Sequence, residues 1–120
     1  MKSKLINCEI GFSDSEIHNY FVTEKDVSMA LKCWNDQFIE LKFINFICLN
    51  STNYFDTSMF QEVFESPILN KAIKIMYDEP PLQHNLRVFQ ILDTNDDVAF
   101  EIVCEGLKIR KIEDTYFTDY

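Results

Sequence analysis

Residues 86–112 place two stretches of alternating side chains on either side of an acidic turn that lacks glycine. Side chains of a β-strand point alternately to the two faces of a sheet, so this period of two predicts a hairpin. Its turn, residues 93–97, consists of Asp, Thr and Asn, and Asp and Asn readily adopt turn conformations. We expect the apolar side of the hairpin to build the core and the acidic tip to face solvent.

The N-terminal half shows the same period. Strand candidates are residues 5–10 and 16–22, followed by a clear alternation over residues 27–33 and again over residues 39–43. The last run continues into residues 46–49, which are apolar on both faces. This pattern predicts an extended meander whose final strand is more deeply covered than the others.

The centre of the chain changes period. Ser58, with a glutamine three positions later, fits a capping box and predicts a short helix over residues 59–64. Ser66 and Pro67 predict a second helix start, with serine at the cap and proline at the first helical position. Apolar residues then recur at helical spacing over residues 68–77, and two consecutive prolines follow soon after.

The last part of the chain returns to strands. Gly106 offers a bend, and residues 107–110 begin a short strand with Lys108 and Arg110 outward. Residues 113–120 form an acidic, aromatic tail that we expect to fray. The order of strands, helices and strands predicts one α+β domain over residues 1–120. Its sheet should be largely antiparallel, built from N- and C-terminal meanders, with one or two central helices packed on one face.

Charge limits the classes of partner. Twenty acidic residues face eleven Lys plus Arg, which gives a net charge of −9. Such a field repels phosphate backbones and anionic lipids, so nucleic acid and membrane surfaces are poor partners, and it attracts cationic proteins. The alternative is that the charge merely keeps the domain soluble.

The chain has four cysteines without close spacing, Cys8, Cys33, Cys48 and Cys104, and no histidine stands near a cysteine pair. We expect structural thiols in a reducing cytoplasm, without a zinc site. No secretion signal and no apolar run of membrane-spanning length occurs, so a soluble, cytoplasmic protein is expected.

The acidic turn invites a calcium interpretation, because Asp93, Asn95 and Asp97 alternate like the first ligands of an EF-hand loop. The sixth position is Val98 instead of glycine, and the twelfth is Cys104 instead of glutamate. The flanks are also predicted as strands, whereas an EF-hand requires helices. A hairpin turn is therefore the better interpretation.

Catalytic candidates are sparse. Glu101 and Glu105 share the polar side of a predicted strand, where a solvated face is expected rather than an acid–base pair. His84 and His18 could act as bases, but no Ser or Cys nucleophile has a recognisable context. We expect no enzyme activity, no cofactor and no metal.

Acidic and aromatic residues alternate in the C-terminal third of the chain. Tyrosines serve as rigid anchors in protein interfaces, and complementary charge speeds encounter with the partner. The alternative is an ordinary solvated surface with a frayed tail. The candidate partner-binding residues are Tyr77, Asp78, Glu79, Asp93, Asp96, Asp97, Glu113, Asp114, Tyr116 and Tyr120.

The order of features is a strand pair over residues 27–36 and 38–43, a helix opened by Ser66-Pro67, and the segments 84–93 and 98–105. This order resembles small bacterial α+β domains among the immunity proteins of polymorphic and contact-dependent toxin systems. The resemblance implies a non-catalytic cytoplasmic protein that tightly binds a cognate toxin domain and blocks its active site or substrate path. It transfers no binding residue, because such interfaces differ between pairs.

The basic cleft of a nuclease toxin would suit an acidic inhibitor, so a cognate basic toxin is the expected partner. One alternative is a housekeeping or regulatory module that forms a homodimer or binds a small apolar ligand. The aromatic residues of the chain could line such a pocket, although packing in the core explains their number equally well. The residues concerned are Phe38, Phe43, Phe46, Phe55 and Phe60.

An uncharacterised hydrolase is a further alternative.

Overall fold

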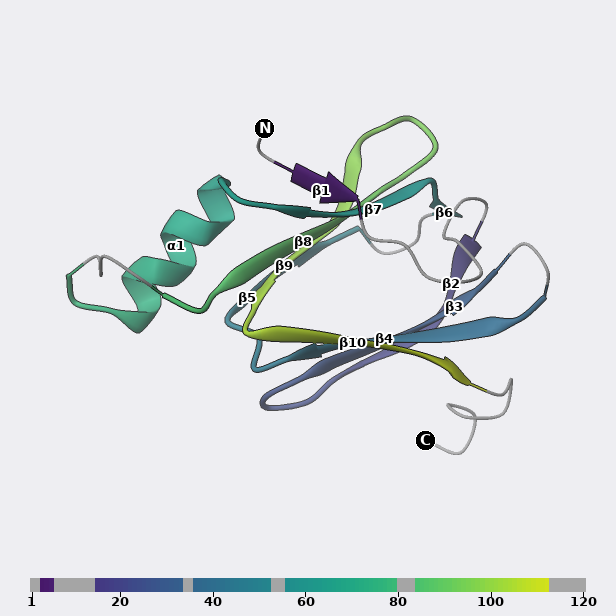
Figure 1. Ribbon diagram of the computed structural model, residues 1–120, viewed down its shortest axis with the longest axis horizontal. Helices are drawn as coiled ribbons and strands as arrows, with labels where there is room; N and C mark the ends of the chain where they lie inside the picture. The colour runs from purple at the N-terminus through teal and green to yellow at the C-terminus, as the bar shows by residue number, and fades with distance from the viewer. Residues whose placement is uncertain (1–2, 6–14, 34–35, 53–55, 80–83, 113–120) are drawn as a thin grey trace.

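The computed structural model describes residues 3–5, 15–33, 36–52, 56–79 and 84–112 (Figure 1). These residues form ten strands and one helix, α1 (Pro67–Met76). The strands are β1 (Ser3–Leu5), β2 (Ser15–Val22), β3 (Val27–Lys32), β4 (Phe38–Ile44), β5 (Cys48–Ser51), β6 (Asp56–Thr57), β7 (Met59–Val63), β8 (Arg87–Leu92), β9 (Val98–Cys104) and β10 (Gly106–Ile112).

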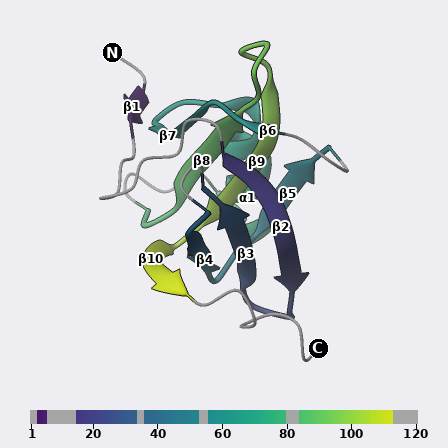
Figure 2. The ribbon, with the colours of Figure 1, turned by 90° about the vertical axis from the view of Figure 1, so that its right-hand side faces the viewer.

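The strands form two five-stranded sheets, and within each sheet all neighbouring strands pair in the antiparallel direction. Sheet A has the order β1-β7-β8-β9-β5, and sheet B has the order β10-β4-β3-β2-β6. The two sheets lie face to face in Figure 1, with α1 beside sheet A. Figure 2 shows β2, β3 and β4 of sheet B side by side.

Two long segments turn a shared corner between the sheets. β4 continues into β5 past Asn45, whose φ of 53° is the left-handed conformation that asparagine tolerates. β9 continues into β10 past Glu105. The backbone ladder persists around the corner, because Glu105 N donates to Ile44 O (2.9 Å) and Ile47 N donates to Val103 O (2.8 Å). On the other side of the molecule, β6 runs through Ser58 into β7 and also changes sheet.

The main core fills the space between the sheets. Phe43 is fully buried at its centre, with ring centroids 5.4 Å from Phe100, 5.8 Å from Phe89 and 6.2 Å from Phe60. Aromatic rings at such separations add packing energy beyond the area they bury. Phe43 and Phe60 therefore belong to the core, and this explains two of the aromatic residues that could have lined an apolar ligand pocket.

The helix forms a third layer on the outer face of sheet A. Ser66 caps it, since its Oγ accepts a hydrogen bond from Ile68 N (3.3 Å), and Pro67 occupies the first turn. Its apolar stripe packs over one row of sheet residues and makes a second buried cluster. That cluster contains Cys48, Val63, Ile68, Leu69, Ala72, Leu86, Val88 and Val103.

Most predicted elements are confirmed, including the strands around residues 16–22, 27–33 and 39–43 and the helix that starts at Ser66-Pro67. The hairpin is also confirmed, although the outer face of both its strands carries residues buried under α1 as well. At the N-terminus the structure has β1, and residues 6–10 of the predicted first strand lie outside the described part. No helix of the described chain has the length and hydropathy needed to cross a membrane.

The predicted helix over residues 59–64 is wrong, because this segment is β7. Ser58 N donates to Leu92 O (2.8 Å) instead of taking part in a capping box. A helix of six residues gains few internal hydrogen bonds, whereas β7 pairs with β8 on one side and β1 on the other.

The predicted antiparallel pairing is confirmed, but the strands are divided between two sheets. The predicted meander also ends earlier, because β5 pairs with β9 in sheet A. The expectation that its final strand is more deeply covered is wrong, because β5 lies at the edge of sheet A and is less buried than β3 and β4.

The described cysteines, Cys33, Cys48 and Cys104, are free and buried. They behave as small apolar residues of the two clusters, as expected for structural thiols. Cys8 lies outside the described residues.

Candidate protein-binding surface

The candidate interface residues fall into two groups at opposite ends of sheet A. Asp78 and Glu79 are exposed beyond the end of α1, and Tyr77 is half-buried against the cluster under the helix. Asp96 and Asp97 are exposed in the turn between β8 and β9, far from the end of α1 (Figure 1). The length of β8 alone separates the two ends by about 20 Å, at roughly 3.3 Å per residue. The other four candidates, Glu113, Asp114, Tyr116 and Tyr120, lie outside the described residues.

The acidic turn is a rigid hairpin tip. Asp93 N donates to Asp97 O (2.9 Å), and Asp96 N donates to Asp93 O (3.0 Å). The Asp93 carboxylate accepts from Asn95 N (2.9 Å) and Asp97 N (3.1 Å) through the same oxygen, Oδ1. Asp96 has a φ of 63°, which aspartate tolerates in turns. Asp93 therefore holds the turn together, and Asp96 and Asp97 are its exposed carboxylates.

A row of polar side chains crosses the outer face of sheet A. Gln61, Gln90, Glu101 and Asn50 are direct cross-strand neighbours on β7, β8, β9 and β5. Gln61 Nε2 donates to Gln90 Oε1 (2.9 Å), and Gln90 Nε2 donates to Glu101 Oε2 (2.6 Å). Ser66 Oγ donates to the same Glu101 oxygen (2.9 Å). The helix cap and the sheet thus hold one carboxylate in a defined orientation.

Beside this row lies an open pocket of about 370 Å³. Glu101 is half-buried in its wall, and Val98, which directly follows the acidic tip, is 47% exposed at its rim. The sequence predicted Glu101 on the solvated polar side of a strand, together with Glu105, and its contacts with Ser66 and Gln90 were not predicted. The complete lining is Asn50, Ser51, Thr52, Val98, Ala99 and Glu101.

A second hollow, of about 260 Å³, lies at the corner where the sheets meet. Its carboxylates are engaged in holding the corner. Glu105 accepts hydrogen bonds from Asn45 Nδ2 (3.0 Å) and Asn85 Nδ2 (3.2 Å), and Asp26 accepts one from Asn45 N (3.0 Å). These interactions give Glu105 a structural role, so it does not form a solvated pair with Glu101. The lining is Glu24, Lys25, Asn45, Phe46, Ile47, Met76 and Glu105.

The outer face of sheet B carries both basic and acidic side chains. Lys42 and Lys108 are direct cross-strand neighbours, an arrangement that is unfavourable for like charges. The row beside them pairs Arg110 with Glu40 (Nε to Oε1, 2.6 Å), and Glu40 is only 4% exposed. Lys32 on β3 lies 3.6 Å from Asp36 (Nζ to Oδ1) and opposite Glu16 in the register with β2. The described residues of this face therefore combine basic side chains with carboxylates that offset part of their charge.

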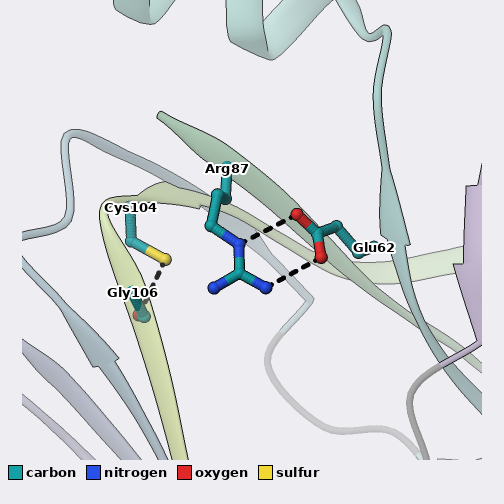
Figure 3. A network of polar contacts seen from close by, with 4 residues as sticks. All are labelled: Glu62, Arg87, Cys104 and Gly106. Atoms are coloured by element: carbon teal, nitrogen blue, oxygen red, sulfur yellow. Dashed lines mark hydrogen bonds and ion pairs between the residues drawn. The ribbon is translucent and has the colours of Figure 1, made fainter. Parts of the chain in front are cut away.

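An ion pair between the buried Glu62 and the more exposed Arg87 closes the inner face of sheet A (Figure 3). Glu62 is 7% exposed, and both of its oxygens accept from Arg87, at 2.9 Å from Nε and 2.9 Å from Nη2. The hydrogen bond to Glu62 raises the pKa of the Arg87 guanidinium further above its usual value. Arg87 also lies over the Phe89 ring, 4.9 Å from its centroid. Nearby, burial raises the pKa of the Cys104 thiol to about 12. The Cys104 Sγ donates a hydrogen bond to Gly106 O (3.3 Å).

His84, the candidate general base, has a local backbone role. Its Nδ1 accepts a hydrogen bond from Leu86 N (3.1 Å), which orients the chain as it enters β8. His18 belongs to β2. Among the described residues, no group of three or more acidic, His or Cys side chains is placed to hold a metal ion.

Comparisons of the chain with family models, with curated proteins and with solved structures find no match.

Proposed function

We propose that this protein is a non-catalytic binding protein, an immunity protein that neutralises a cognate bacterial toxin domain. The observation that carries the proposal is the acidic tip between β8 and β9, where Asp96 and Asp97 are exposed on a turn that contains no basic residue. Lys42 and Lys108 lie on the outer face of sheet B, and Lys71 and Lys74 lie on α1. A concentration of negative charge at one end of sheet A orients a basic partner before contact, which raises the rate of productive encounter.

The proposed docking surface combines the acidic tip with the neighbouring outer face of sheet A. Asp96 and Asp97 supply exposed charge on a turn that Asp93 keeps rigid, so little conformational entropy is lost when they bind. A nuclease toxin is the class that fits best, because its substrate cleft must be basic to hold phosphates. An acidic tip that occupies such a cleft would exclude the nucleic acid.

The test uses a toxin domain encoded beside the gene for this protein. Purified toxin is assayed alone and with increasing amounts of this protein, and the mixture is analysed by light scattering. The proposal predicts complete inhibition at a 1:1 ratio and a complex with the mass of one copy of each chain. Undiminished toxin activity at a large excess of this protein, with both chains remaining separate, would overturn it.

A further inference from the structure

We propose that the pocket beside Glu101 receives an arginine side chain of the partner and is the anchor of the interface. This inference rests on the proposed function and names the chemistry that the docking surface recognises. It begins with a carboxylate that is fixed in place before any partner arrives.

Glu101 lies in the middle of sheet A, with β8 on one side and β5 on the other. Among the described residues, Ser66 Oγ and Gln90 Nε2 donate to Glu101, and both hydrogen bonds end on Oε2. The carboxylate is therefore held from the side of the helix cap, and Oε1 is available for a further donor. A charged acceptor held in this way loses little entropy on binding, and hydrogen bonds to charged groups are the stronger ones.

The rest of the pocket suits a planar cation with several donors. Asn50 is exposed directly opposite Glu101 on β5, and its side-chain carbonyl is an acceptor. Ser51 Oγ donates to Thr52 O (2.8 Å), so the oxygen of this hydroxyl can still accept. A guanidinium presents five donors in one plane and can contact a carboxylate and a neighbouring acceptor together, whereas an ammonium is a compact point charge.

The pocket also has an apolar side for the stem of such a residue. Val98 is 47% exposed at the rim and stands directly after Asp97. Arginine buries its methylene groups along apolar surface and keeps its charged head among polar groups. A partner arginine that enters past the acidic tip would place its stem on Val98 and its head on Glu101.

The first experiment uses the isolated protein, with N-acetyl-arginine amide as the probe and N-acetyl-lysine amide as its comparison. In ¹H–¹⁵N spectra, we expect saturable shifts at residues 50–52 and 98–101 with the arginine probe, and weaker ones with the lysine probe. Shifts spread evenly over exposed carboxylates such as Asp78 would overturn the inference.

Two variants test the pocket. Glu101→Gln keeps the acceptor for Ser66 and Gln90 but removes the charge, and it should abolish the shifts. Asn50→Lys places an ammonium opposite Glu101 and should block the pocket from within. Asn70→Lys on the exposed face of α1 makes the same charge change elsewhere and is the matched control. Thermal unfolding of each variant checks that the fold is retained.

The same variants, measured against the toxin, separate the two proposals. We expect Glu101→Gln and Asn50→Lys each to weaken the complex by about tenfold to a hundredfold, the usual range for one charged hydrogen bond. Asn70→Lys should change the affinity by much less. Full affinity of both pocket variants for a toxin that the wild type neutralises would overturn the pocket and leave the proposed function standing. Arginine binding at the pocket without any toxin neutralisation would overturn the proposed function and leave the recognition of arginine by the pocket standing.

Discussion

Loss of either member of the ion pair between Glu62 and Arg87 should lower the free energy of unfolding, but by unequal amounts. The Glu62 side chain is 9% exposed and the Arg87 side chain is 43% exposed. Removing Arg87 leaves a buried carboxylate without its partner, a change that typically costs about 3–5 kcal/mol. Removing the charge of Glu62 leaves a guanidinium that water can reach, so the cost should be nearer the ~1–2 kcal/mol of lost hydrogen bonds.

Arg87→Met preserves much of the side-chain volume and removes the charge, whereas Glu62→Gln keeps the shape of the acid. Loss of the contact between Arg87 and the Phe89 ring adds about 0.5–1 kcal/mol to the first variant. We therefore expect Arg87→Met to be the more destabilising by about 2 kcal/mol or more.

Urea unfolding of the wild type, both single variants and the double variant Glu62→Gln/Arg87→Met measures these terms. In the double variant the unpaired charge is gone, so it should be more stable than the Arg87→Met single variant. Equal costs for the two single variants, or a double variant whose loss is the sum of both, would refute the assignment of Glu62 as a buried carboxylate that depends on Arg87.

Three further perturbations test the core, the tip and the helix cap. Cys104 has an ordinary thiol pKa of 9.0 and one of about 12 in the fold, so its contribution to stability is complete below pH 9 and is lost as the pH rises towards 12. Above pH 9, the free energy of unfolding of the wild type should fall by up to about 1.4 kcal/mol per pH unit relative to that of Cys104→Val. Free energies of unfolding that change in parallel for the two proteins between pH 8 and 10.5 would contradict this. Asp93→Ala should cost about 1 kcal/mol in urea unfolding and Asp93→Asn much less, because asparagine can still accept from the two amides; an equal loss would argue against the turn geometry. Ser66→Ala should cost about 1 kcal/mol, with helix-end amide protection lost first in hydrogen exchange; unchanged protection there would show that Ser66 does not cap α1.

Local patterns were sufficient to predict most of the strands and the main helix. The alternation at residues 27–33 and 98–105 reflects which side chains face the core, and the pair Ser66-Pro67 predicts the start of a helix. Residues 59–64 were mispredicted because their pairing partners, β1 and β8, are distant in the sequence. The division into two sheets depends on the corners at Asn45 and Glu105, which are formed by contacts between segments about 60 residues apart.

The candidate surface was predicted only where it depends on residues that are neighbours in the sequence. The acidic tip follows from residues 93–97 alone, since turn chemistry and charge are local. The special position of Glu101 requires Ser66 and Gln90 to meet it, and no local pattern contains these contacts. Proximity in the sequence also suggested one acidic surface, whereas the length of β8 separates Asp78 and Glu79 from the tip.

The association rate of the protein with the proposed toxin partner tests the central claim most directly. Asp96→Lys/Asp97→Lys and Asp78→Lys/Glu79→Lys change the net charge equally, so any difference between them reports position. By stopped-flow measurement at low salt, we expect the tip variant to associate more slowly than the other by about tenfold or more, with the difference shrinking as salt is added. Equal rates for the two variants would contradict docking through the acidic tip of sheet A.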